Sequence, residues 1–220
     1  YYLCFGLCLV IFHPVQWICL NFFGYQAHKK SVDYLNFMLL RCTNLVGTRY
    51  TFENKDWIPK NVPLIFVSNH QSMYDIIAMI WYLRDFHAKF VSKKELGQGI
   101  PSVSYNLRHG GSVLIDRKDP KQAIPMIKGL SEYIEKHQRS AVIFPEGTRS
   151  KVNYWKTGFY YIALGAQVPI VMAYMDYERK RSGLGPVFVP TGDVEADMAT
   201  IKAFYAPFKG RNAAQFHAGE

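Results

Sequence analysis

Charged residues are missing from the first 28 positions of this 220-residue chain, which contain no Asp, Glu, Lys or Arg. The apolar segment 1–25 is long enough to cross a bilayer, for which about 20 apolar residues suffice. Pro14 is expected to kink or end a helix within it, and Gln16 is costly in lipid. The absence of a small-residue cleavage site argues against a signal peptide. We expect a membrane anchor that spans or dips into the bilayer, with Lys29 and Lys30 on its cytoplasmic side.

Cysteine is scarce and confined to the first fifth of the chain, at Cys4, Cys8, Cys19 and Cys42. None forms a C-x-x-C pair or a Cys–His cluster with zinc spacing, which argues against a structural metal site and fits a reducing compartment. The chain also lacks the G-x-S-x-G motif of hydrolases, the G-x-x-x-x-G-K phosphate loop and a complete G-x-G-x-x-G motif. A serine hydrolase and a nucleotide-binding protein are therefore disfavoured, and no cofactor is indicated.

Negative charge is in the minority, which gives a formal net charge of +9. A basic excess favours an anionic partner, such as nucleic acid, an anionic membrane surface or a phosphorylated substrate. No RNA-binding aromatic motif, zinc-finger spacing or long basic run is present, so we expect no nucleic-acid partner. Membrane lipids and a phosphorylated substrate are the partners that the charge indicates.

After the anchor, a second apolar helix is expected at 31–46 and ends at Gly47. We interpret it as one half of an interfacial helical pair, with a buried core helix as the alternative. From Thr48 onward, short apolar strands alternate with helices. The expected strands are 64–67, 89–91, 112–115, 141–144, 169–175 and 187–189. The expected helices are 72–83, 99–108, 120–136, 157–164 and 193–205.

This alternation predicts an α/β fold with a mostly parallel central sheet flanked by helices. We divide the chain into an N-terminal membrane-associated helical motif, 1–47, and an α/β catalytic domain, 48–220. In such sheets, functional sites collect at the carboxyl ends of the strands. Four distinctive segments are expected there: Asn69-His70, Asp116-Arg117, 145–149 and 168–171. Three histidines in polar surroundings, His87, His109 and His137, are expected to face solvent.

The segment Asn69-His70-Gln-Ser-Met-Tyr-Asp75 places an imidazole and a carboxylate five residues apart after an apolar run. Imidazole can take up a proton near neutral pH, and a carboxylate can hold it in one tautomer. However, Ser72-x-x-Asp75 is also a capping box, so Asp75 could serve only to cap a helix. The string Phe144-Pro-Glu-Gly-Thr-Arg149 likewise follows a strand, and a surface turn is its alternative interpretation. Both motifs together favour an enzyme.

Four ordered segments resemble the motifs of the glycerophospholipid acyltransferases, over about residues 20–175. They are Asn69-His70-x4-Asp75, Gly111-Ser-Val-Leu-Ile-Asp-Arg117, Phe144-Pro-Glu-Gly-Thr-Arg149 and Val168-Pro-Ile-Val171. The nearest resemblance is to the lysophosphatidic acid acyltransferase branch, which makes phosphatidic acid. It implies an αβ acyltransferase fold and membrane association at the cytoplasmic face of the inner or endoplasmic reticulum membrane. The implied co-substrate is acyl-CoA or acyl-carrier protein, with no metal.

The resemblance also implies roles for residues. His70 would take the proton of the acceptor hydroxyl, Asp75 would orient His70, and the hydroxyl would attack the thioester without a covalent enzyme intermediate. Pro169 would shape the site near the acyl donor. The residues that would hold the glycerol phosphate are Arg117, Glu146, Gly147, Thr148 and Arg149.

The chain departs from the pattern of this branch over 176–208, which puts the identity of the acceptor in doubt. Another lysolipid, such as a lysophospholipid or a lyso-aminolipid, is therefore the alternative acceptor. A non-catalytic membrane-binding protein is the alternative class. It would explain the anchor and the charge, but not four motifs at one sheet edge.

Overall fold

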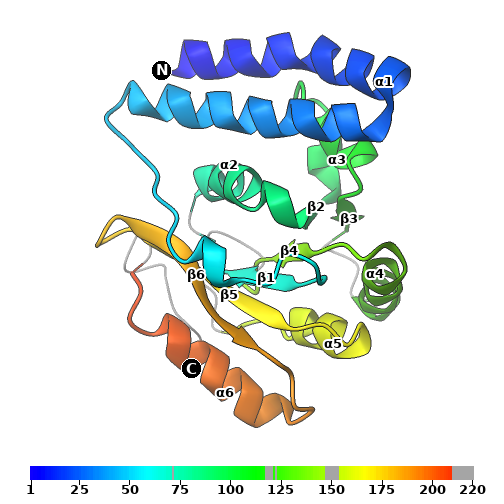
Figure 1. Ribbon diagram of the computed structural model, residues 1–220, viewed down its shortest axis with the longest axis vertical. Helices are drawn as coiled ribbons and strands as arrows, with labels where there is room; N and C mark the ends of the chain where they lie inside the picture. Colours follow the sequence, from blue (N-terminus) through cyan, green and yellow to red (C-terminus); the bar gives the residue numbers. More distant parts are fainter. Residues whose placement is uncertain (71, 117–120, 122, 147–153, 210–220) are drawn as a thin grey trace.

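Figure 1 shows the computed structural model, in which a six-stranded sheet lies between two layers of helices and a helical hairpin covers one layer. The structure describes residues 1–70, 72–116, 121, 123–146 and 154–209. The strand order is β3-β2-β4-β1-β5-β6, and all neighbouring strands are parallel apart from the antiparallel pair β5–β6. The expected α/β fold with a mostly parallel sheet is confirmed.

The described strands are β1 (Ile65–Ser68), β2 (Lys89–Lys93), β3 (Val113–Ile115), β4 (Ala141–Ile143), β5 (Ile170–Asp176) and β6 (Arg181–Phe188). The described helices are α1 (Tyr2–Asn44), α2 (Met73–Tyr82), α3 (Val103–His109), α4 (Ala123–His137), α5 (Gly158–Gly165) and α6 (Val194–Tyr205). Short 3-10 turns occupy Lys55–Trp57, Arg84–Phe86 and Lys94–Gly97. The expected start of a helix at Pro120 lies outside the described residues.

Two apolar cores hold the layers together, one on each face of the sheet. Helix α2 and the second half of α1 pack on one face, where Leu35, Leu39 and Met79 meet Phe66 of β1. Helices α4, α5 and α6 cover the other face against Ile65 and Val67. β1 is fully buried on both sides because alternate residues face opposite cores, which explains its unbroken apolar sequence.

The helix α1 folds back on itself at Gly24, where φ is 79° and ψ is −175°. Glycine adopts this positive φ without steric cost, so the chain turns there. The expected interruption at Pro14 is wrong, because the helix continues through this residue with helical dihedrals. Packing on both sides supports it, through the partly buried Phe12 and the fully buried Gln16. The two halves lie side by side (Figure 1), and Cys8 Sγ is 3.8 Å from Cys42 Sγ.

The first half of α1 exposes an apolar surface. Within the described residues, α1 is the one helix long and apolar enough to cross a membrane, and only 6% of its most apolar window is buried. Its large exposed side chains include Leu3, Leu7, Val10, Ile11, Trp17, Ile18, Phe22 and Phe23. A patch of this kind marks an interaction surface rather than a solvated face. The long apolar helix indicates membrane association.

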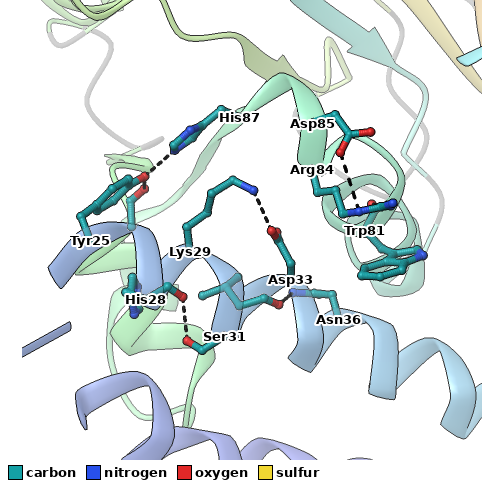
Figure 2. Close-up of polar contacts among 12 residues, drawn as sticks. Tyr25, His28, Lys29, Ser31, Asp33, Asn36, Trp81, Arg84, Asp85 and His87 are labelled. Atoms are coloured by element: carbon teal, nitrogen blue, oxygen red, sulfur yellow. Dashed lines mark hydrogen bonds and ion pairs between the residues drawn. The ribbon is translucent and has the colours of Figure 1, made fainter. Parts of the chain in front are cut away.

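The second half of α1 joins the α2–β2 connection through polar contacts at the amino edge of the sheet (Figure 2). Lys29 Nζ donates to Asp33 Oδ2 at 2.6 Å, and the Tyr25 hydroxyl lies 2.8 Å from His87 Nε2. His87 therefore does not face solvent as expected; it stacks on the Tyr25 ring. Burial lowers the pKa of His87 to about 3, so the ring is neutral. His109 and His137 are exposed, as expected.

Strand β6 begins at Arg181 and not at 187 as expected, and the two glycines within it, Gly183 and Gly185, explain why the sequence pattern did not reveal its start. Both allow close approach of other segments. A Cβ at Gly183 would lie 2.7 Å from the Glu53 carbonyl oxygen, and one at Gly185 would lie 2.3 Å from the Phe204 ring. Close packing at the sheet edge requires both glycines, although glycine within a sequence usually indicates the end of a strand.

Candidate active site

The loop after β1 is fastened to β5 by Asn69. Its side-chain nitrogen donates to the Met175 carbonyl at 2.8 Å, and its oxygen accepts from Met175 N–H at 2.8 Å. Asn69 is fully buried, so both bonds lie in a dry environment where they are strong. This clamp extends the β1–β5 pairing past the end of the strand and fixes where His70 leaves the sheet.

His70 and Asp75 come together at the carboxyl end of β1. His70 Nδ1 lies 3.3 Å from Asp75 Oδ2, and the imidazole keeps 14% of its surface exposed whereas the carboxylate has none. An ionised carboxylate can only accept a hydrogen bond, so this contact places the imidazole proton on Nδ1. Nε2 is then left with a lone pair that can accept a proton from a substrate.

The same carboxylate also caps helix α2. Ser72 N–H donates to Asp75 Oδ2 at 2.7 Å, while the Ser72 side chain accepts from Tyr74 N–H. The capping interpretation of Asp75 is therefore correct, but it does not exclude the contact with His70. Because the helix start holds the carboxylate in place, capping helps to fix the imidazole.

Two residues after β4 support the histidine from the other side. The Phe144 ring stacks on the imidazole, with ring centres 4.3 Å apart. Glu146 Oε2 accepts a hydrogen bond from His70 N–H at 2.7 Å. Glu146 is 4% exposed, so its carboxyl group braces the β1–α2 loop from inside the protein.

Burial raises the pKa of the Glu146 carboxyl to about 8; the His70 N–H opposes this shift and the nearby Asp75 charge adds to it. Between the ordinary Glu value of 4.5 and about 8, the folded chain holds a proton that the unfolded chain has released. Folding stability should therefore decrease as the pH rises through this window.

We expect Glu146→Gln to remove this pH dependence, because an amide keeps the acceptor for His70 N–H and cannot ionise. The difference in the free energy of unfolding between the wild type and Glu146→Gln should decrease by about 3 kcal/mol, to the disadvantage of the wild type, as the pH rises from 5 to 8. Urea unfolding at several pH values measures it. Glu135→Gln, on the exposed face of α4, is the matched control. Parallel pH curves for the wild type and Glu146→Gln would show that Glu146 ionises normally.

Two cavities of very different size lie at opposite edges of the sheet. The cavity at the amino edge has a volume of about 50 Å³, far too small for a lipid substrate, and includes Lys29 and Lys89 in its wall. The cavity at the carboxyl edge has about 750 Å³, within the range of small-molecule sites, and Ser72 and Tyr177 form part of its wall. Size and position therefore favour the larger cavity as the substrate site.

The wall of the larger cavity combines aromatic rings with positive charge. Arg181 is paired with Glu53 at 2.7 Å. Arg49 and Lys180 are exposed. The wall residues with aromatic rings or positive charge are Tyr1, Tyr2, Arg49, Tyr50, Tyr74, Tyr177, Lys180 and Arg181. An amphipathic anion matches this lining, since rings contact its apolar part and cations attract its charge.

The expected substrate-binding residues divide into three groups. Arg117, Gly147, Thr148 and Arg149 lie outside the described residues. Glu146 lies beside His70, as given above. Pro169 precedes β5 at the amino edge, where its carbonyl accepts from Ile65 N–H at 3.0 Å. The expectation that 168–171 lies at the carboxyl edge is wrong, because it is the other end of β5, at Asp176 and Tyr177, that reaches the site.

Sequence reasoning missed two residues that shape the site, Asn69 as a clamp and Tyr177 as a partner of Asp75. The Tyr177 hydroxyl donates to Asp75 Oδ1. Tyr177 follows the last residue of β5, so the rule that sites gather at carboxyl ends of strands could have identified it. In the described part of the chain, no group of three or more His, Cys, Asp or Glu residues could hold a metal ion.

Comparisons with known proteins identify the family and the fold of this chain. The family model described as Acyltransferase matches residues 49–176. The chain is 28% identical over 159 residues to the 1-acyl-sn-glycerol-3-phosphate acyltransferase alpha of Mus musculus, covering 69% of this chain and 55% of that protein. It is 42% identical over 90 residues to the 1-acyl-sn-glycerol-3-phosphate acyltransferase of Helicobacter pylori, covering 40% and 35%. The chain thus spans about half or less of the length of these relatives.

A solved structure shares the fold. The crystal structure of the 1-acyl-sn-glycerophosphate (LPA) acyltransferase PlsC from Thermotoga maritima superposes with a TM-score of 0.62 at 19% sequence identity. The match covers 92% of this chain and 97% of that one.

Proposed function

This chain belongs to the acyltransferase family, whose model matches more than half of it, and from that premise we propose that it acylates lysophosphatidic acid to phosphatidic acid. The observation that carries the proposal is the His70–Asp75 pair. His70 Nδ1 lies 3.3 Å from the fully buried Asp75 carboxylate, which assigns the ring proton to Nδ1 and the basic lone pair to Nε2, and the imidazole keeps 14% of its surface exposed. The curated relatives named for 1-acyl-sn-glycerol-3-phosphate supply the acceptor.

In the proposed reaction, His70 Nε2 removes the proton of the acceptor hydroxyl as its oxygen attacks the thioester carbonyl carbon. Asp75 stabilises the imidazolium that forms. The tetrahedral intermediate then expels the thiolate as the C–S bond breaks, and the imidazolium returns the proton to the sulfur. An ester bond forms and a thiol leaves, so atoms and charge balance without a covalent enzyme intermediate.

For the phosphate of the acceptor, we propose Arg117, which follows β3 in the sequence, and Arg149, which follows β4, together with Gly147 and Thr148, which precede Arg149 in the sequence. Guanidinium groups bind phosphate oxygens in two-pronged fashion, and each charge-assisted bond contributes roughly 1.5–3 kcal/mol. Glu146, whose carboxyl oxygen accepts from His70 N–H, would fix the start of the segment that carries Gly147, Thr148 and Arg149.

The exposed apolar face of α1 would lie in the membrane, and this supports a division into a membrane-associated motif, 1–47, and a catalytic domain, 48–220. The larger cavity lies between this hairpin and the β5–β6 connection, since its wall includes Tyr2, Val46 and Lys180. A lipid could thus pass from the bilayer to the site while its charged end meets cations. We place the site at the cytoplasmic face, where acyl-CoA or acyl-carrier protein serves as donor.

A panel assay with purified protein tests this function. Lysophosphatidic acid, other lysophospholipids and a phosphate-free lyso-aminolipid are offered with either acyl-CoA or acyl-carrier protein, and products are identified by mass spectrometry. We expect phosphatidic acid as the main product. Arg149→Ala should raise the Michaelis constant for lysophosphatidic acid roughly 10- to 100-fold, the equivalent of one lost charge-assisted bond.

Lys136→Ala, on the exposed end of α4, removes one positive charge away from the site and serves as the control for surface charge. Preference for the phosphate-free acceptor, together with an unchanged Michaelis constant in Arg149→Ala, would assign the chain to the alternative acceptor.

A further inference from the structure

We propose that Tyr177 is a positioning residue of the acyl-transfer site, which holds the Asp75 carboxylate in the plane that His70 requires. The inference rests on the proposed function, because it assigns Tyr177 a role in the same reaction. Tyr177 lies one residue beyond β5 and comes from a segment 102 positions away from Asp75 in the chain.

The contact is direct, and it joins a half-buried phenol to a fully buried carboxylate. The Tyr177 hydroxyl donates to Asp75 Oδ1, while Oδ2 receives Ser72 N–H at 2.7 Å and lies 3.3 Å from His70 Nδ1. Burial raises the pKa of Tyr177, and the Asp75 charge raises it further. The phenol therefore stays protonated and donates throughout the working pH range.

The backbone around Tyr177 is fixed by the same clamp that fixes His70. Met175, two residues earlier, exchanges two hydrogen bonds with the Asn69 side chain, and Asn69 is the neighbour of His70. The phenol follows β5 and the imidazole follows β1, and the Asn69–Met175 hydrogen bonds join the ends of these two strands. The Asp75 carboxylate lies between them and accepts hydrogen bonds at both oxygens, which restricts its rotation about the bond to the carboxyl carbon.

Rotation of the Asp75 carboxylate matters because Oδ2 contacts two groups, Ser72 N–H at 2.7 Å and His70 Nδ1 at 3.3 Å. A small rotation toward Ser72 would lengthen the distance from Oδ2 to His70 Nδ1. Without the phenol, we expect a carboxylate that still caps α2 but holds the imidazole less often in the reactive orientation. The expected loss is therefore in turnover.

Tyr177 also lines the larger cavity, so direct contact with the substrate is the competing interpretation. The two differ in what they predict. A substrate contact changes the Michaelis constant and acts independently of Asp75. A positioning residue changes the rate at saturation, and because it acts through the Asp75 carboxylate, its replacement has no further effect once Asp75 is replaced.

The test is Tyr177→Phe in the full chain, alone and combined with Asp75→Asn, assayed with lysophosphatidic acid and acyl-CoA. We expect kcat to fall roughly 10- to 100-fold, as for the loss of a hydrogen bond to a charged group, with the Michaelis constant within about twofold of the wild type. In the Asp75→Asn background, single-turnover rates should change less than about twofold on adding Tyr177→Phe.

Tyr160→Phe is the matched control. Tyr160 donates to Asp197 Oδ2 at 2.8 Å, so it forms a second buried Tyr–Asp pair, and this pair lies at α6, away from the site. It should lower thermal stability and leave kcat unchanged. An unchanged kcat in Tyr177→Phe, an equal loss in the Asp75→Asn background, or an equal loss in Tyr160→Phe would overturn the inference.

These outcomes are separate from the failure of the proposed function. If purified wild-type protein does not acylate lysophosphatidic acid, the proposed function fails irrespective of Tyr177. If the wild type is active but His70→Ala keeps its turnover, the assignment of His70 as the base fails, and the role of Tyr177 fails with it. If His70→Ala is inactive but Tyr177→Phe turns over normally, the proposed function stands and only the role of Tyr177 is rejected.

Discussion

Replacing His70 with alanine is expected to reduce acyl transfer at least about 1,000-fold while the protein stays folded. His70 Nε2 is the base that removes the hydroxyl proton, and a positioned base contributes on the order of 10²–10⁴ in rate. The effect should lie in the upper part of this range, because the imidazole also returns the proton to the leaving thiol. Initial rates at saturating acceptor and donor measure the loss.

Two checks make the His70 result specific. Far-UV circular dichroism and thermal unfolding show whether the variant is folded, since the imidazole also stacks on Phe144. His137→Ala removes an exposed histidine at the end of α4 and should keep full activity. Turnover of folded His70→Ala within about tenfold of the wild type would exclude His70 as the base.

Replacing Asp75 with asparagine should lower kcat about 100- to 1,000-fold, a loss far larger than its effect on stability. The amide is nearly the same size, and its oxygen can still accept from Ser72 N–H and His70 Nδ1, which both contact the same carboxylate oxygen, Oδ2. Its nitrogen then faces the Tyr177 hydroxyl, and the negative charge beside the imidazole is lost. An uncharged partner also fails to stabilise the imidazolium.

The capping role of Asp75 predicts a different result for the same variant. Loss of a helix cap costs about 1 kcal/mol of stability and leaves the chemistry alone. Unfolding free energy and kcat are therefore measured on one preparation, well below the melting temperature. If Asp75→Asn melts earlier but turns over like the wild type, Asp75 is a cap and nothing more.

Local apolar patterns predicted the sheet well because its inner strands are buried on both faces. The run 64–67 could only be a strand inside a core, and β1 occupies Ile65–Ser68. His70 and Asp75 could be paired from the sequence because only five residues separate them, and the helix start after Ser72 turns both toward the same point.

The features that the sequence did not predict depend on contacts between segments that are distant in the chain. Gly24, and not Pro14, breaks α1 because packing of the hairpin supports the proline, while the turn needs a positive φ. Gln16 is costly in lipid, but it is buried against the rest of the protein. Tyr177 reaches Asp75 across 102 positions, and no local pattern encodes that contact. Pro169 is placed at the amino edge by the direction of β5, which its apolar sequence does not reveal.

Product stoichiometry during the first turnovers tests the account most directly. Purified wild-type protein in lipid vesicles is mixed with lysophosphatidic acid and labelled acyl-CoA, and thiol release is followed together with phosphatidic acid. Direct transfer at His70 predicts one phosphatidic acid for each thiol released at every time point, no thiol release without acceptor, and no label on the protein. Free fatty acid in place of phosphatidic acid, or a labelled protein in the absence of acceptor, would contradict direct transfer at His70.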